Sequence, residues 1–125
     1  MTDSIRRLPD TELEVMQAIW DCAPPVSKAD IEEKVYSTHP MAETTLQTLL
    51  SRLSEKDFLC VTIQKRKKYY TPLVTREDYQ VSQSKSFFQK VCGGSLSAFA
   101  NALCEGGLTK EEVAELRRLL EEGEL

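Results

Sequence analysis

The stretch "ETTLQTLLSRLSEKDFLCVTIQKRKKYYTP", residues 43–72, carries the clearest structural pattern of this 125-residue chain. Its first part predicts a helix over residues 43–56, because leucines recur there at helical spacing. This apolar stripe consists of Leu46, Leu49, Leu50 and Leu53. The remaining face carries short polar side chains and little charge, unlike a typical solvated helix. Such a face can approach the edges of nucleic-acid bases closely.

Two segments rich in β-branched and aromatic residues follow, at 58–64 and 68–73, and they predict a β-hairpin. The run KRKK, residues 65–68, lies at or near the turn between them. No glycine marks this turn, so its type and register stay open. The predicted hairpin therefore has a basic tip, although the whole chain has a formal net charge of −4.

Two shorter helical patterns precede this stretch. The first, residues 8–20, has Thr11 and Glu14 at the spacing of a capping box, and two prolines soon follow it. The second, residues 26–37, begins with Ser27, a residue type that favours helix N-caps. The chain therefore begins with three helices and a hairpin.

This order of elements within residues 1–73 is the pattern of a winged helix-turn-helix DNA-binding domain, in a fold that is mainly α with a small β-hairpin. In that arrangement the third helix enters the major groove. Glutamine can pair with adenine, and threonine methyls can touch thymine. The expected base-reading residues are Thr44, Thr45, Gln47 and Thr48. The expected phosphate-binding residues are Arg52, Lys65, Arg66, Lys67 and Lys68.

Residues 74–125 predict three further helices, separated by two glycine pairs. A segment of this length is too short to bury their apolar faces alone. We therefore expect a helical dimerisation segment that packs on its copy in a homodimer, which places two reading heads on one DNA. The expected interface residues are Phe87, Phe88, Val91, Leu96, Phe99, Leu103, Val113, Leu116 and Leu120.

Composition excludes several other classes of function. No apolar run is long enough to span a membrane, and the N-terminus lacks a signal-peptide core, so a cytoplasmic protein is predicted. The four cysteines have no CxxC spacing, so we expect no metal and no cofactor. The single histidine, His39, stands apart from any nucleophile in the sequence, so no catalytic arrangement is predicted. Paired carboxylates occur only on charged helix faces, where exposure to solvent is the ordinary reason for them, so they do not indicate a catalytic site.

The segments "LPDTELEVMQAIW", "TTLQTLLSRLSEKDFL", "YYTPLVTREDY" and "FFQKVCGGSLSAF", in this order, resemble the BlaI/MecI family of penicillinase and methicillin-resistance repressors. The resemblance runs from Leu8 to Leu120. It implies a dimeric winged-helix repressor of palindromic operators in front of antibiotic-resistance genes. It also implies a membrane sensor protease pathway that leads to cleavage in the C-terminal segment. Copper-responsive relatives carry a cysteine-pair motif near the C-terminus, and this sequence has none.

The start of the predicted recognition helix departs from the family's pattern. The family often has a Ser-Pro-Lys-Thr-like run where this chain has residues 42–45. Thr45 keeps the matching threonine, whereas Thr44 replaces a lysine and Glu43 adds a negative charge. The resemblance therefore implies an operator that differs from the standard one. After this helix Asp57 takes the place of a common glycine, and aspartate tolerates a left-handed conformation better than most residues.

The bond that matches the family's scissile bond falls at Ala102–Leu103, with the family's asparagine displaced to Asn101. Cleavage at this bond and a purely structural role for Leu103 in a dimer core both stay open. Two alternatives to the proteolysed repressor also remain. One is a winged-helix protein-interaction module without DNA binding, which the acidic total and Glu43 favour. The other is a repressor of the same family with a different inducer, for example a redox signal at the cysteines.

Overall fold

The computed structural model describes residues 5–122, apart from the side chains of Leu120 and Glu122. The chain divides by packing into two compact units, of which one ends at Gln83 and the other begins at Ser84. The predicted boundary between residues 73 and 74 divides the chain by function, into a DNA-binding domain and a dimerisation segment, and it stays a prediction. The packing boundary falls later because Tyr79 and Ser82 are buried against the first unit.

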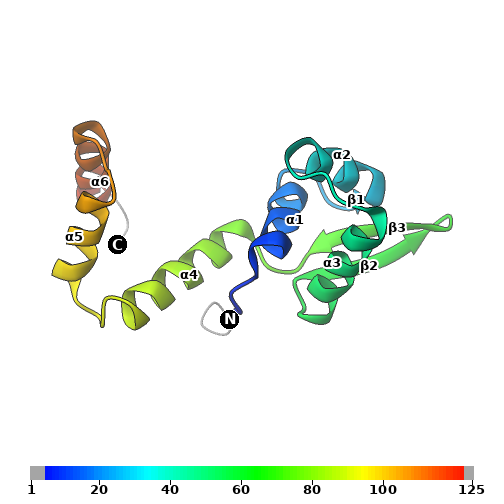
Figure 1. Ribbon diagram of the computed structural model, residues 1–125, viewed down its shortest axis with the longest axis horizontal. Coiled ribbons are helices and arrows are strands. Elements are labelled where there is room, and N and C mark those ends of the chain that lie inside the picture. The colour runs from blue at the N-terminus through cyan, green and yellow to red at the C-terminus, as the bar shows by residue number, and fades with distance from the viewer. Residues whose placement is uncertain (1–4, 123–125) are drawn as a thin grey trace. The chain divides into compact units, whose positions relative to one another are not determined.

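The first unit contains three helices and a small sheet, which confirms the predicted winged-helix architecture (Figure 1). The helices are α1 (Asp10–Trp20), α2 (Lys28–Thr38) and α3 (Glu43–Glu55). The strands are β1 (Val26–Ser27), β2 (Leu59–Gln64) and β3 (Lys67–Pro72). The hairpin of β2 and β3 projects beyond the three helices (Figure 1). We call this hairpin, residues 59–72, the wing.

The sheet has the order β1-β3-β2, and all of its pairs are antiparallel. Leu59 is paired with Pro72 and Gln64 with Lys67, so only two residues close the wing. These are Lys65 and Arg66, with φ values of 50° and 69°. Two successive positive φ values are typical of a type I′ turn, which matches the twist of a hairpin. This geometry settles the turn that the sequence left open. The two-residue strand β1 was not predicted, because it is too short to show a period.

Helix ends follow local chemistry. Ser27 caps α2 as predicted, since its Oγ accepts a hydrogen bond from the backbone N–H of Asp30 at 3.2 Å. The capping box predicted at Thr11 is wrong, because α1 begins at Asp10 directly after Pro9, whose ring fixes φ at −57°. Thr11 consequently lies inside the first turn, where its side chain cannot act as the N-cap.

Glu14, the second residue of the predicted capping box, instead pairs with a histidine. The Oε2 atom of Glu14 lies 2.8 Å from Nδ1 of His39, the residue that ends α2. The partner of His39 in this pair is a carboxylate, not a serine or cysteine nucleophile. The pair ties the start of α1 to the end of α2.

The core of the first unit lies between the helices and the wing, and the predicted leucine stripe of α3 faces it. The fully buried side chains include Val15, Met16, Ile19, Val26, Ile31, Leu46, Leu50, Leu53, Phe58 and Tyr70. Glu12 is buried too, and its Oε1 accepts a bond of 2.6 Å from Nζ of Lys56. Because an unpaired buried carboxylate is costly, this ion pair fixes how α1 meets the end of α3.

The end of α3 turns the chain directly into the wing. Asp57 has φ 65°, in the left-handed region, as expected of the residue that replaces the family's glycine. The N–H of Phe58 donates to the carbonyl of Leu53 at 2.9 Å, and the N–H of Asp57 donates to that of Ser54 at 3.1 Å. These two bonds form a Schellman motif, in which the residue after the turn packs into the core. The ending fixes the wing relative to α3.

The second unit is helical, with the last part of α4 (Arg76–Lys90) followed by α5 (Leu96–Glu105) and α6 (Lys110–Glu122). Thr109 and Glu112 form the predicted capping box of α6, with bonds of 3.1 and 2.9 Å. Phe99 packs its ring against Phe87 and Phe88 at centroid distances of 6.0 and 5.7 Å. No residue of α5 is buried, so the apolar side of this unit remains largely uncovered.

Candidate nucleic-acid interface

The polar face of α3 is exposed and lies opposite its leucine stripe. At 100° per residue, Thr44, Thr48 and Ser51 form the outermost line of this face. The hydroxyl of Thr48 donates to the carbonyl of Thr44 at 2.9 Å. Because its proton is used within the helix, Thr48 can offer its methyl group and oxygen lone pairs outward, but no donor. Thr44 is exposed, as is Thr45.

Gln47 lies on the flank of α3 that faces the wing. It lines a hollow of about 560 Å³, together with residues from the start of α2 and from the wing. The other lining residues of this α2–wing hollow are Ser27, Lys28, Ala29, Arg66, Lys67, Lys68 and Tyr69. Gln47 and Lys68 also line a smaller hollow of about 190 Å³ between α3 and β2. The structure therefore brings one predicted base reader together with three predicted phosphate-binding cations.

The remaining predicted residues are placed differently. Thr45 and Arg52 lie on the flank of α3 opposite Gln47, by the same helical geometry. Lys65 occupies the turn of the wing and does not line either of the two hollows. An interface that includes all of these residues must therefore contact both flanks of α3 as well as the wing tip.

The side chains of the wing cations have no partner among residues 5–122. The side chains of Lys65, Arg66, Lys67 and Lys68 are all exposed, and none of these side chains makes a hydrogen bond or ion pair within the described residues. Only the backbones of Lys67 and Lys68 are paired, with β2. Lys56 and Arg76, in contrast, are paired with carboxylates at 2.6 Å. Four neighbouring cations without counterions repel one another, so the arrangement is favourable chiefly when an anion lies beside it.

The start of α2 adds a contribution that the sequence did not reveal. Ser27, Lys28 and Ala29 line the α2–wing hollow, which places the positive end of an 11-residue helix beside the wing cations. The N-terminal end of a helix favours a phosphate group. The capping serine followed by a lysine was the only signal of this role in the sequence.

Lys28 also contacts the recognition helix. Its Nζ donates to Oε1 of Glu43 at 3.2 Å, with the side chains 25% and 71% exposed. The acidic residue that departs from the family's pattern is therefore bound to a cation, which reduces its repulsion of nearby phosphates.

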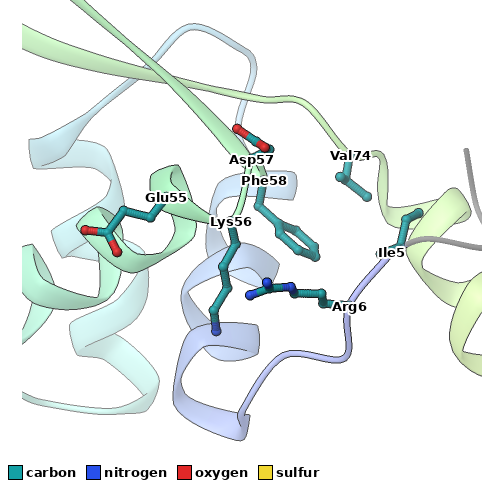
Figure 2. Close-up of a pocket in the computed structure, with 7 residues that line it drawn as sticks. All are labelled: Ile5, Arg6, Glu55, Lys56, Asp57, Phe58 and Val74. Atoms are coloured by element: carbon teal, nitrogen blue, oxygen red, sulfur yellow. The ribbon is translucent and has the colours of Figure 1, made fainter.

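A third hollow, of about 390 Å³, lies at the opposite end of α3. Figure 2 shows Arg6 and Lys56 extending toward one another beside the ring of Phe58, whereas the carboxylates of Glu55 and Asp57 point away. Lys56 is already bonded to Glu12. None of the seven lining residues is a serine, cysteine, threonine or histidine, so this hollow offers no nucleophile of those types.

The described residues contain no group of three or more histidine, cysteine or carboxylate side chains that could hold a metal ion. The four cysteines are free thiols, with Cys22 and Cys92 half-buried and Cys60 and Cys104 exposed. Between residues 5 and 122, no helix is long and apolar enough to cross a membrane.

Three helices followed by a β-hairpin, with a polar face of α3 beside a cationic wing, place this chain in the class of winged-helix proteins. Residues 8–122 match the model of the penicillinase repressor family, and the chain belongs to that family. It is 33% identical over 119 residues to a penicillinase repressor of Bacillus licheniformis, covering 94% of this chain and 92% of that protein. It is 30% identical over 121 residues to the methicillin resistance regulatory protein MecI of Mammaliicoccus sciuri, covering 96% of this chain and 98% of that protein. These findings confirm the resemblance seen in the sequence.

A solved structure also resembles the chain. It is the solution structure of monomeric BlaI from Bacillus licheniformis in complex with the blaP half-operator. The match has a TM-score of 0.52 and 32% sequence identity, and it covers 61% of this chain and 92% of that chain.

Proposed function

We propose that this protein is a transcriptional repressor that binds a palindromic DNA operator as a homodimer. The observation that carries the proposal is the α2–wing hollow, in which three unpaired cations and Gln47 converge beside a polar, nearly uncharged helix face. The family supports a repressor, and the relative solved with its half-operator supports DNA as the partner. The protein then acts in the cytoplasm, where the DNA is accessible, and has no enzymatic activity.

The proposed roles divide between the helix and the wing. Thr44, Thr45, Gln47 and Thr48 contact base edges, and Gln47 is the residue that can pair with adenine in two bonds. Arg52 and the cations at 65–68 hold phosphates, together with the N-terminal end of α2. The acidic remainder of the chain discourages adsorption to DNA of any sequence, because only a docked α3 brings the wing to the backbone.

The second unit supplies the proposed dimer contact. Val91 and Leu96 are 69% and 73% exposed, and Leu116 is 38% exposed. Phe87 is exposed as well, while Phe88, Phe99, Leu103 and Val113 are half-buried. Leu120 lies outside the described side chains. Exposed apolar side chains at this density are typical of a surface that another copy covers.

The regulatory proposal follows from the family resemblance. Ala102 and Leu103 lie inside α5, and the carbonyl of Ala102 accepts a helical bond from Gly106 at 2.9 Å. A protease needs an extended substrate, so cleavage there by a sensor-protease pathway requires α5 to unwind locally. A redox inducer is the alternative, in which oxidation of Cys92 or Cys104 changes the apolar surface. Cys104 is exposed and Cys92 half-buried.

Two variants separate the proposed roles. Changing Lys65, Arg66 and Lys67 together to Ala should weaken binding to every DNA sequence alike, because phosphate contacts carry no sequence information. Changing Gln47 to Ala should instead relax selection at particular base pairs. Binding of DNA duplexes is measured by fluorescence anisotropy.

The control variant also loses three positive charges, because Arg6, Arg7 and Lys34, which lie elsewhere in the first unit, are replaced by Ala. Its affinity for DNA should change little. The assigned roles are contradicted if the wing variant changes which base pairs are selected while Gln47→Ala only lowers the affinity for every sequence. If no DNA sequence in a random pool binds to the wild-type protein, the result supports the alternative of a protein-interaction module without DNA binding. The Lys28 contact weighs against that alternative, because the charge of Glu43 is partnered.

A further inference from the structure

Glu43 is held in an unusual setting for an exposed carboxylate. It is the first residue of α3, and its Oε1 accepts a hydrogen bond of 3.2 Å from Lys28. The Lys28 side chain is only 25% exposed, so it is largely fixed by its surroundings, whereas that of Glu43 is 71% exposed. Among the described residues, no hydrogen bond reaches the second carboxylate oxygen, Oε2. One oxygen is therefore bonded to Lys28, and the other can still accept a hydrogen bond.

The position of Glu43 in α3 brings this oxygen to the interface. Residues four apart lie on the same side of a helix, so Glu43 lies one turn before Gln47, on the flank that faces α2 and the wing. In helix-turn-helix proteins, residues in the N-terminal part of the recognition helix contact base edges. Glu43 is thus placed among the residues that approach the bases first.

The chemistry of a carboxylate restricts what it can contact there. An ionised carboxylate only accepts hydrogen bonds. In the major groove, guanine presents two acceptors and thymine presents one acceptor and a methyl group. Adenine presents a donor beside an acceptor, whereas cytosine presents a donor alone. A carboxylate at the base edges therefore favours cytosine and disfavours the other three bases.

Lys28 makes such a contact feasible. A bare carboxylate near the DNA backbone is repelled by phosphates, which opposes docking. The ammonium group of Lys28 offsets this charge at short range and holds one of the two carboxylate oxygens.

We propose that Glu43 determines specificity by accepting a hydrogen bond from the N4 amine of a cytosine in each operator half-site, with Lys28 as its positioning residue. The inference rests on the proposed function, since it requires α3 to enter the major groove. It adds a residue that selects sequence where the family resemblance indicated only a departure.

The test selects DNA sites from a random pool with the wild-type protein, with Glu43→Gln and with Glu55→Gln. The wild type should select cytosine at one position of each half-site, with a preference of about tenfold over the next base. Glu43→Gln should move that preference to adenine, because a glutamine side chain pairs with the N6 and N7 atoms of adenine. Glu55→Gln makes the same charge change at the far end of α3, where the carboxylate points away from its hollow (Figure 2), and should leave the selected sites unchanged.

Lys28 is tested on the sites selected by the wild type. Lys28→Met should reduce the preference for cytosine to about threefold or less, and Lys28→Arg should restore it, because arginine also donates to carboxylates. Thermal unfolding of each variant verifies that the fold is unchanged. A full cytosine preference in Lys28→Met overturns the positioning role.

The remaining outcomes separate this inference from the proposed function. If Glu43→Gln binds all sequences more tightly and selects the same sites as the wild type, Glu43 acts only as a repelling charge and the inference is overturned alone. If the wild type selects no sequence at all, the proposed function is overturned, and the inference falls with it.

Discussion

The wing turn combines backbone strain with unpaired charge, so one double substitution should move stability and DNA binding in opposite directions. Lys65→Asn with Arg66→Gly replaces two residues that hold positive φ values of 50° and 69°. Left-handed backbone costs an ordinary residue roughly 1–2 kcal/mol, so the change relieves about 2 kcal/mol in total. Glycine adds freedom to the unfolded chain at a cost of about 0.5–1 kcal/mol. The first unit should therefore gain about 1 kcal/mol in the free energy of unfolding.

The same substitution removes two cations from each subunit, or four from the proposed dimer. Each phosphate contact contributes about −0.9 to the slope of log K against log salt concentration. If about three of the five proposed cations in each subunit contact phosphates, a dimer neutralises about six phosphates and has a slope of about −5. The variant, which loses two of these contacts in each subunit, should have a slope of about −2. At 0.15 M salt, the loss of four contacts corresponds to about a thousandfold weaker binding.

Two assays follow the two effects. Urea unfolding is monitored by the fluorescence of Trp20, the only tryptophan in the chain, which reports on the first unit. Binding is measured by anisotropy at several salt concentrations, with Lys34→Asn as a control for loss of charge away from the wing. A variant that is no more stable and binds DNA with the wild-type salt slope refutes both the strain and the electrostatic role of the wing tip.

Three further predictions concern the supporting structure. Lys56→Met leaves the buried carboxylate of Glu12 unpaired and should destabilise the first unit by about 3 kcal/mol in urea unfolding; a loss below about 1 kcal/mol contradicts the importance of this pair. The hydrogen bond from Arg76 lowers the pKa of Asp21 below its ordinary value of 3.8. The stability that this pair contributes is therefore present above the unfolded-state pKa of Asp21 and is lost as pH falls through its folded-state pKa. Asp21→Asn should consequently make the free energy of unfolding fall less steeply with decreasing pH than in the wild type. If the two proteins show the same dependence on pH, the pair does not contribute in this way. Leu116→Glu should convert the proposed dimer to a monomer in sedimentation and weaken operator binding, whereas a wild type that is already monomeric at micromolar concentration contradicts the dimer.

Much of the fold could be predicted because local chemistry and packing agree. The leucine spacing of α3, the Ser27 cap and the Thr109–Glu112 capping box each specify an element that the structure confirms. The capping box at Thr11 failed because Pro9 is the N-cap of α1, so the helix begins two residues earlier than the motif suggests. Strand β1 was missed because its pairing with Tyr69 and Tyr70 is a long-range contact that no local pattern encodes.

The candidate site could be predicted only in part. The sequence identified Gln47 and the wing cations, but it did not place Lys28 beside them. It identified Glu43 as a foreign charge, whereas the contact with Lys28 depends on how α2 meets α3. Tertiary contacts of this kind follow from packing, which residue spacing does not reveal. The second unit's interface residues stay predictions, since only a partner can show which apolar side chains it covers.

A repressor of the proposed kind recognises a particular DNA sequence. The most direct measurement compares the affinity of the wild-type protein for a palindromic duplex, selected from a random pool, with its affinity for a scrambled duplex of the same length and composition. At 0.15 M salt, the selected duplex should bind at least about a thousandfold more tightly, the range typical of specific recognition. Equal affinities for the two duplexes, or no binding to either, would contradict the account.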